Sequence, residues 1–367
     1  MQSGLLLCLC GDVMMGRGVD QILPHPRHRR LKEPKVASSI TYVELAEKKN
    51  GPIPNRVDFE YPWGDALGEL ERAIPDVRII NLETSVTDSR DFWPKAVNYA
   101  MSPQNVRALT AARIDCCALA NNHAMDFGRA GLVETLDTLE RAGLAVAGAG
   151  YDLTGAQAPA IKIVTPECRV LVFAFGSITS GIPPEWAAAP GKPGIRLLAE
   201  LSSRTVDEVA SAVWSVRKPG DVVVASIHWG SNWGYAIPPE ETAFAHGLIE
   251  VAGVDVVHGH SSHHPKAIEL HHGKLILYGC GDFIDDYEGI GGFREFRSDL
   301  TLTFLPTIDR STGRLAQLVM IPFRLKKLRL NRASHDDALW LCTMFDREGK
   351  AFGTQFALTE NETVKLV

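Results

Sequence analysis

The sequence predicts an α/β fold whose functional groups gather along one edge of a sheet. Short apolar runs of strand length alternate with segments of helical periodicity along most of the chain. Five of the runs lead directly into short polar segments that are rich in metal-binding side chains. Because the ends of buried strands lie on one rim of a sheet, where open α/β folds bind their ligands, we expect these polar segments to meet there.

The five apolar runs have the lengths expected of buried strands. They lie at residues 5–10, 77–80, 114–120, 222–227 and 254–257. The polar segments that follow them are Gly11-Asp12, Asn81-Leu82-Glu83, Asn121-Asn122-His123, His228-Trp229-Gly230 and the run from His258 to His263.

The polar segments supply Asp, Glu, Asn and five His, with no Cys among them. Oxygen and imidazole donors without thiolate suit Mn, Fe, Zn or Mg, and two adjacent ions need about this many ligands. Taken singly, each such residue is more often a turn former, a solvated group or a core side chain. Their order along the chain favours a dinuclear metal centre.

Helical segments separate the predicted strands. They are expected at residues 64–72, 103–112, 129–142, 204–216 and 239–252. In the third of these, Leu132, Leu136 and Leu139 recur at the spacing of one helix face, and Gly143 follows as a C-terminal stop. This alternation of strand and helix is typical of the α/β class.

The segment from about residue 21 to residue 63 interrupts the alternation. It contains six prolines and one short helix expected at residues 42–49. An irregular stretch of this length in a compact domain tends to be functional or mobile, which makes it a candidate lid. The last part of the chain is strand-rich, with runs at 300–305 and 315–322, and its tail adds a helix at 336–346 and two strand-like pieces.

The 367 residues could build one large α/β core or two domains. No Pro-, Gly- or Ser-rich linker divides the motifs, and they must converge on one centre. We therefore expect one catalytic domain over residues 1–326, with the insertion 21–63 as its candidate lid. Residues 327–367 are expected to form a C-terminal extension that packs on the same domain.

Charge and cysteine content narrow the choice of partner and compartment. A net charge of −6 and a pI near 6.1 argue against nucleic acid as a partner. A local basic run at residues 25–32 could contact an anionic substrate, although a solvated loop is the more common outcome.

Most of the seven Cys lie in or beside apolar runs, which favours free thiols in a reducing compartment. With no membrane-span-length run and no signal-peptide pattern, a cytoplasmic location is expected.

The order Asp, Glu, Asn-His, His and His-x-x-His resembles the calcineurin-like metallophosphatase superfamily. More narrowly, the segments Gly11 to Arg17, Asn81 to Glu83, Ala120 to His123 and Gly259 to His263 resemble the CapA branch, which is associated with poly-γ-glutamate capsule synthesis. The resemblance covers about residues 5–325. It implies a four-layer sandwich in which two mixed β-sheets pack face to face and are flanked by helices.

The resemblance also implies roles for individual residues. Asp12 would bind one of two divalent ions and Glu83 would bridge both. The remaining metal ligands implied are Asn122, His228, His260 and His263. His123 would be a catalytic acid or hydrogen-bond donor toward the substrate, where an imidazole stabilises developing negative charge. Arg17, at the end of the first motif, is a candidate substrate contact.

Three residues depart from the phosphatase pattern. Met14 stands where the second ligand of an Asp-x-His motif would fall, so one metal site lacks an imidazole. The bridging residue is Glu83 instead of Asp, which allows a different metal separation. Ala124 follows the catalytic His where Asp is usual, and Asp126 comes three residues after it. These departures match the CapA branch and argue against ordinary phosphomonoesterase activity.

Residues 278–287 form a further motif, whose glycines permit a sharp turn and a close approach to a ligand. Within it, Asp282 could hold a metal-bound His or act as an acid or base, and a solvated turn carboxylate is an equal alternative. His264, beside His263, is a second candidate catalytic group.

Two aromatic loops are expected to shape a substrate pocket. Trp229, Trp233 and Tyr235 come directly after the predicted ligand His228, and Trp186 could provide an opposite wall. The alternative is a satellite hydrophobic cluster beneath the loops.

Three functions remain open from the sequence. The favoured one is epimerisation at the Cα of a peptide residue. The peptide epimerases of lasso-peptide biosynthesis are similar to the CapA branch, and a chain with no expected anchor and with an aromatic-lined loop fits a cytoplasmic peptide-modifying enzyme better than an exported capsule factor. His123 with Asp282 or His264 would then supply the two acid–base groups. The second is metal-dependent hydrolysis of amide or phosphoester bonds in polyglutamate metabolism. The third is a metal-free binding module. The expected substrate is a peptide or a polyglutamate-like polymer.

Overall fold

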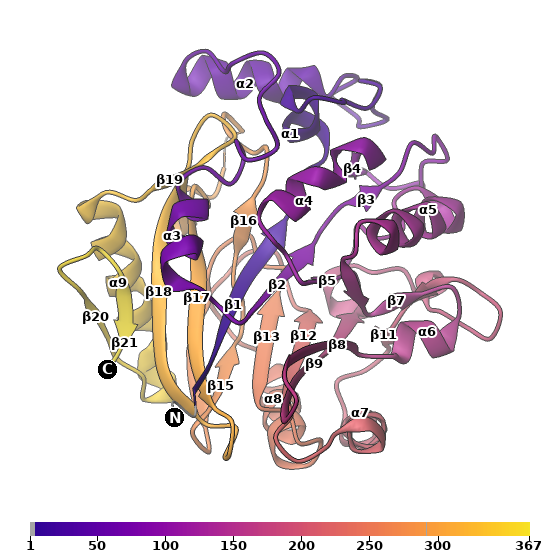
Figure 1. Ribbon diagram of the computed structural model, residues 1–367. Helices are drawn as coiled ribbons and strands as arrows, with labels where there is room; N and C mark the ends of the chain where they lie inside the picture. Colours follow the sequence, from indigo (N-terminus) through magenta and orange to yellow (C-terminus); the bar gives the residue numbers. More distant parts are fainter. Residues whose placement is uncertain (1–3, 291) are drawn as a thin grey trace.

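Two mixed β-sheets pack face to face in the computed structural model, which describes residues 4–290 and 292–367. One apolar core fills the space between the sheets and extends beneath the helices outside the larger sheet. A second core lies between the smaller sheet and its own helices. The layers are visible in Figure 1, and the predicted α/β sandwich is confirmed.

The larger sheet is built around the first strand, β1 (Gly4–Val13). β1 runs parallel to β2 and β16 and antiparallel to β17. The other strands are β2 (Val77–Leu82), β5 (Cys116–Ala118), β6 (Ala145–Ala147), β16 (Asp282–Ile284), β17 (Leu300–Asp309), β18 (Leu315–Leu325), β19 (Leu330–Arg332), β20 (Phe356–Leu358) and β21 (Val364–Leu366).

The smaller sheet has a parallel centre, in which β12 pairs with both β9 and β13. Every residue of β12 and β13 is buried, including the histidines at their ends, and both strands begin with apolar runs. The strands are β8 (Ala160–Thr165), β9 (Cys168–Ser177), β11 (Leu197–Leu198), β12 (Val222–His228), β13 (Val256–His260), β14 (Ile268–His271) and β15 (Lys274–Leu277). Two small pairs complete the set: β3 (Ser85–Val86) with β4 (Ala100–Met101), and β7 (Ala149–Gly150) with β10 (Gly194–Ile195).

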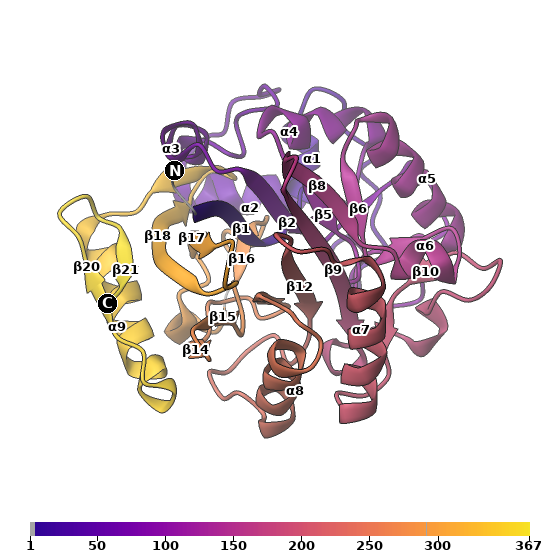
Figure 2. The ribbon, with the colours of Figure 1, turned by 60° about the horizontal axis from the view of Figure 1, so that its bottom comes forward.

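The helices cover the outer faces of the sandwich. Figure 2 shows α7 and α8 outside the smaller sheet, where their apolar side chains build the second core. The helices are α1 (Arg17–Ile22), α2 (Ile40–Asn50), α3 (Asp65–Ala73), α4 (Arg107–Ala111), α5 (Gly128–Arg141), α6 (Leu153–Gln157), α7 (Ser203–Val216), α8 (Pro239–Glu250) and α9 (His335–Gly349). Residues 103–112 form a 3₁₀ turn followed by α4 instead of one continuous helix.

The insertion at residues 21–63 lies with α1 and α2 at the top of the molecule in Figure 1, above the end of β1. The tail adds α9 and places β20 and β21 at one edge of the larger sheet, where β21 pairs with β18. In the part of the chain that the structure describes, no helix combines the length and apolar character needed to span a bilayer. The seven Cys side chains are buried and free.

β1 and the turn before β16 approach closely at Gly11. The backbone amide of Asp12 donates a hydrogen bond to the carbonyl of Gly281 over 3.0 Å. A Cβ on residue 11 would lie 1.8 Å from that carbonyl oxygen, so only glycine fits there without moving the backbone. The contact sets the position of Asp12 beside Asp282, its register partner.

Gly11→Ala is expected to lower the free energy of unfolding by about 3 kcal/mol, the upper end of ordinary overpacking, because a backbone oxygen cannot rotate away. Urea denaturation measures this. The matched control is Gly68→Ala in α3, where the nearest atom to the new Cβ is a flexible Arg72 nitrogen at 3.6 Å. That change should raise stability by up to about 1 kcal/mol. A Gly11→Ala protein as stable as the wild type would contradict this account.

Candidate metal centre

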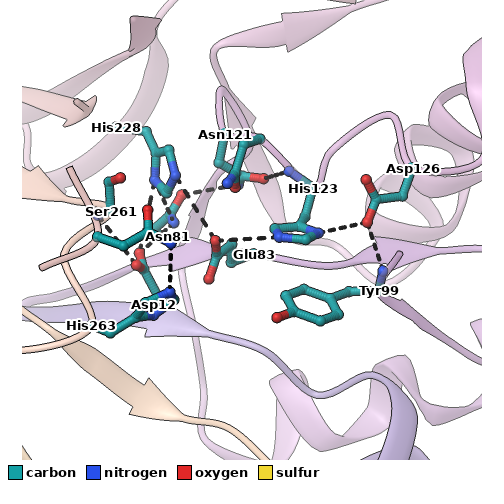
Figure 3. Close-up of polar contacts among 12 residues, drawn as sticks. Asp12, Asn81, Glu83, Tyr99, Asn121, His123, Asp126, His228, Ser261 and His263 are labelled. Carbon is teal, nitrogen blue, oxygen red and sulfur yellow. Dashed lines mark hydrogen bonds and ion pairs between the residues drawn. The ribbon is translucent and has the colours of Figure 1, made fainter. Parts of the chain in front are cut away.

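Strand ends from both sheets meet at one buried centre, shown in Figure 3. Asp12 lies at the end of β1, and Glu83 follows the end of β2. His228 and His260 are the last residues of β12 and β13 and are register partners. These four side chains are at most 2% exposed, so the strands bring polar groups into the interior of the sandwich.

The donor atoms form two overlapping groups. Those of Asp12, His228 and His260 lie within 4.8 Å of one another, and so do those of Asp12, Glu83 and Asp282. Asp12 belongs to both groups. The Nδ1 atoms of His228 and His260 are 2.9 Å apart, and His228 Nε2 is 3.9 Å from Glu83 Oε1. The arrangement therefore has two adjacent positions that share one carboxylate.

Two donor atoms of the centre, Glu83 Oε2 and His228 Nε2, are buried without a hydrogen-bond partner, and so is Asn122 Oδ1, on the residue before His123. A buried polar atom left unpaired costs about 1–3 kcal/mol, so such atoms in one place indicate a bound group. They belong to carboxylate, carboxamide and imidazole side chains, which are ligand types that divalent metals accept. The residues present thus fit a metal pair.

The electrostatics of the centre favour a cation. Burial, and then the charge of Asp282, raise the pKa of Asp12 to about 8. Burial and the charges of Asp12 and Asp282 raise the pKa of Glu83. Burial lowers the pKa values of His228 and His260, which keeps both rings in the neutral form that binds metals. The positive charges of His263 and Lys95 offset only part of the repulsion among these crowded carboxylates.

His123 stands beside this group, with Nε2 3.9 Å from Glu83 Oε1. Its Nδ1 donates to Asp126 over 2.6 Å, and the ring of Tyr99 stacks on it at 3.7 Å. Burial lowers the pKa of His123 to about 4, although the charge of Asp126 opposes this effect. Asp126 therefore orients the His123 ring, although it lies three residues after His123 and not directly after it, where the phosphatase pattern has its Asp. The ammonium of Lys95 is 2.6 Å from Asp126 Oδ1.

His263 faces Asp282 on the other side of the centre. Its Nδ1 lies 3.0 Å from both carboxylate oxygens of Asp282. Burial lowers the pKa of His263, but the charges of Asp282 and Asp12 outweigh it and raise the pKa to about 9. Asp282 thus holds this His, which is one of the two roles considered for it, and it also lies within reach of the ligand group of Asp12 and Glu83.

Comparison with known proteins agrees with this geometry. Residues 6–287 match the family described as bacterial capsule synthesis protein PGA_cap. The chain belongs to this family. The matched span contains the strand ends that build the centre, and the resemblance to the CapA branch is confirmed.

Several named relatives of this PGA_cap protein are similar over long spans. A probable polyglutamine synthesis accessory protein of Mycobacterium tuberculosis is 49% identical over 98% of this chain and 95% of the relative. The PGA biosynthesis protein CapA of Bacillus subtilis is 27% identical over 75% of this chain and 62% of the relative. The capsule biosynthesis protein CapA of Bacillus anthracis is 24% identical over 77% of this chain and 60% of the relative.

One substrate residue predicted for this PGA_cap protein is engaged elsewhere. The guanidinium of Arg17 forms two hydrogen bonds with the carboxylate of Asp286 and further ones with Glu33 and the hydroxyl of Tyr42. The side chain is buried, and these partners take up four of its five N–H donors. The prediction of a direct substrate contact is therefore corrected: Arg17 is a buried structural cation that lies over Tyr99 at 4.6 Å.

His264 is not brought to the centre either. Its Nδ1 contacts the carbonyl of Pro265 at 3.0 Å, its Nε2 accepts from the amide of Gly234, and its ring stacks on Phe296 at 4.4 Å. Both nitrogens are occupied by backbone groups. The prediction that His264 is catalytic is corrected on this geometry.

The aromatic loops of the PGA_cap protein divide between core and rim. Trp229 is buried and donates its Nε1–H to the carbonyl of Tyr278 in the second core. Trp233 and Tyr235 pack with Phe296, and Trp233 also lies 5.2 Å from the ring of His263. Trp229 and Tyr235 therefore belong to hydrophobic clusters, as the alternative interpretation expected, whereas Trp233 contacts His263 at the centre.

Trp186 is connected to the centre through Lys95, whose ammonium lies 5.4 Å from the centroid of the Trp186 ring. Lys95 also donates to the carbonyl of Asn122 and contacts His123 Nδ1 at 3.2 Å. Sequence reasoning missed Lys95 and Tyr99. Neither residue follows a strand or belongs to a recognised motif, and only the folded chain brings them to His123.

Proposed function

We propose that this chain is a metal-dependent enzyme of polyglutamate or capsule synthesis that acts on a peptide or polyglutamate-type substrate. The names of its relatives support the pathway. The observation that carries the enzymatic part is the convergence of Asp12, Glu83 and Asp282 with two neutral imidazoles around unpartnered donor atoms. Asp12, Glu83, Asn122, His228 and His260 would hold two divalent ions, with Asp282 and His263 beside them.

The favoured reaction is inversion at a peptide Cα. Bound metal would polarise the substrate carbonyl and acidify the adjacent C–H. In Figure 3, Glu83 lies between His123 on one side and Asp12 with His263 on the other, and His263 contacts Asp282. Groups on two sides of one carbon are what proton removal from one face and return to the other require. Asp126 orients His123 so that its Nε2 faces the centre.

Hydrolysis of an amide or phosphoester bond is the second candidate. The same His123 could donate a proton to a leaving group, and its fixed contact with Asp126 supports that role as well. The two reactions differ in what they incorporate from the solvent. Inversion introduces solvent hydrogen at Cα and leaves the chain intact, whereas hydrolysis cleaves the chain and adds solvent oxygen.

The metal-loaded protein is expected to exchange the α-hydrogen of a γ-glutamyl peptide for deuterium in D₂O, with inversion and without cleavage. His123→Asn should slow this exchange by about 10²–10⁴-fold, the usual contribution of one acid–base group, and leave metal content unchanged. Mass spectrometry and chiral amino-acid analysis measure both. The matched control is His335→Asn, an exposed His paired with Glu362. Cleavage with ¹⁸O uptake from labelled water would establish the hydrolase instead. If neither inversion nor cleavage were detected, both reactions would be contradicted for this substrate class.

A further inference from the structure

A second cluster of ligand-type side chains lies where α8 meets the edge strand β14. His246 and Glu250 are one turn apart on α8, so they share one face of the helix. Glu269 and His271 are two residues apart on β14, so they share one face of the strand. His272 follows in the turn to β15. The two faces meet, which places three imidazoles and two carboxylates together.

The contacts within the cluster are close. His246 Nε2 donates to Glu269 Oε1 over 2.8 Å, and His271 Nδ1 lies 3.8 Å from the same oxygen. The donor atoms of these three residues lie within 4.8 Å of one another, and His271 also belongs to a second such group with Glu250 and His272. The rings of His246 and His271 are stacked with centroids 3.6 Å apart.

These separations suit a transition-metal cation. Zn²⁺ binds imidazole nitrogen and carboxylate oxygen at roughly 2.0–2.2 Å in a tetrahedron, which places neighbouring donors about 3.3 Å apart. The observed 2.8 and 3.8 Å lie on either side of this value. A tilt of the stacked rings toward Glu269 would direct a nitrogen of each at one position. A surface His–Glu hydrogen bond needs only one imidazole, whereas this carboxylate has two.

The carboxylate of Glu269 is also held from behind. Its Oε2 accepts a hydrogen bond from the hydroxyl of Tyr278 over 2.6 Å, so Oε1 is aimed at the two rings. Metal-binding carboxylates are typically fixed by such a second contact. The side chains of His246, Glu269 and His271 are 29%, 11% and 18% exposed, so the cluster is partly ordered by packing and still open to solvent.

The cluster is separate from the first centre. That centre lies at the carboxyl end of β13, at His260, whereas the turn at His272 precedes the amino end of β15. Because β13 and β15 are parallel, with Val256 opposite Leu275, the turn lies toward the opposite end of the strands. α8 lies on the outer side of this sheet in Figure 2.

We propose that His246, Glu269 and His271, flanked by Glu250 and His272, form a second divalent-cation site that takes Zn²⁺ or a similar transition metal and joins α8 to β14. The site does not depend on the proposed function. It has a physical connection to the first centre, because Glu269 holds Tyr278, Tyr278 accepts from Trp229, and Trp229 follows His228 in the chain.

The test is titration of the chelator-treated full chain with Zn²⁺ by isothermal calorimetry. The wild type should bind one equivalent of Zn²⁺ more than the double variant His246→Gln, His271→Gln. Alternatively, the double variant should bind that equivalent at least tenfold more weakly than the wild type. His335→Gln, which removes an exposed His from another His–Glu pair, should titrate like the wild type. The same stoichiometry and affinity in the double variant and the wild type would overturn the proposal.

A second measurement keeps the test decisive if the double variant folds poorly. In the variant Asp12→Asn, Glu83→Gln, which disables the first centre, Co²⁺ should still produce the visible absorption of a tetrahedral nitrogen–oxygen site at one equivalent. Adding Glu269→Gln to that protein should remove the absorption. If the variant Asp12→Asn, Glu83→Gln bound no Co²⁺, the proposed site at His246, Glu269 and His271 would be overturned. The candidate metal centre at Asp12 would not be affected by that result.

Discussion

Asp12→Asn is expected to remove metal from the candidate centre, with affinity at the shared positions reduced by at least about 100-fold. Changes to groups that merely support ligands already cost 10–100-fold, and Asp12 would bind directly. It belongs to both donor groups, so its loss affects both positions. An amide of the same shape keeps the packing and removes the negative charge that the metals need.

Elemental analysis of the purified proteins, followed by titration with Mn²⁺ and Zn²⁺, measures this effect. Asp88→Asn is the matched control, because it removes the same charge from an exposed position. Its metal content should equal that of the wild type. If the wild type itself holds less than one metal per chain and binds neither ion, the metal-free binding module becomes the better account.

Asp12→Asn is expected to stabilise the metal-free protein against unfolding. Burial and the charge of Asp282 raise the pKa of Asp12 to about 8, far above its value in the unfolded chain. The folded state therefore favours the protonated carboxyl, and ionisation destabilises it increasingly as the pH rises from about 4 to about 8. Asn cannot ionise, so metal-free Asp12→Asn should be more stable than metal-free wild type at pH 8 and equal to it near pH 4. Urea denaturation in a chelator at both pH values measures the difference.

The sequence predicted that the proposed ligand side chains would meet, because their positions depend on strand ends. A buried strand that ends in a ligand-type residue places that side chain at the rim, whatever connects the strands. Asp12, Glu83, His228 and His260 all satisfy this rule, and they converge. The rule also explains an omission: β9, a central strand of the smaller sheet, is not among the predicted strands because no polar motif follows it.

The roles of Arg17 and His264 could not be predicted in the same way. Each side chain could serve either substrate or structure, and the outcome depends on partners that are distant in the sequence. Arg17 meets Asp286, 269 positions away, and His264 meets Gly234, 30 positions away. Residue type and motif position contain no information about these contacts, which arise only when the strands and loops are assembled.

Asp286→Ala is expected to lower the free energy of unfolding by about 3–5 kcal/mol, the cost of removing one member of a buried ion pair. Arg17 and Asp286 are 3% and 0% exposed, and Asp286 also accepts from the amide of Gly18 over 2.8 Å. Burial alone would lower the pKa of Arg17, but the charges around it, that of Asp286 first, together outweigh burial and keep the guanidinium ionised. Removing Asp286 therefore leaves a desolvated cation that cannot shed its proton and that keeps Glu33 as a carboxylate partner at one nitrogen.

The double variant Arg17→Met, Asp286→Leu separates the charge effect from packing. Replacing both members of the buried pair with apolar groups removes the guanidinium, and Glu33, which loses its cation, can take up a proton, so the double variant should be more stable than Asp286→Ala. Arg204→Met, which breaks the exposed pair with Glu208, should change stability by less than about 1 kcal/mol. Urea denaturation measures the free energy of unfolding of the three proteins. If Asp286→Ala were no less stable than Arg204→Met, Arg17 would not be held as a buried cation, and its assignment as a substrate contact would be open again.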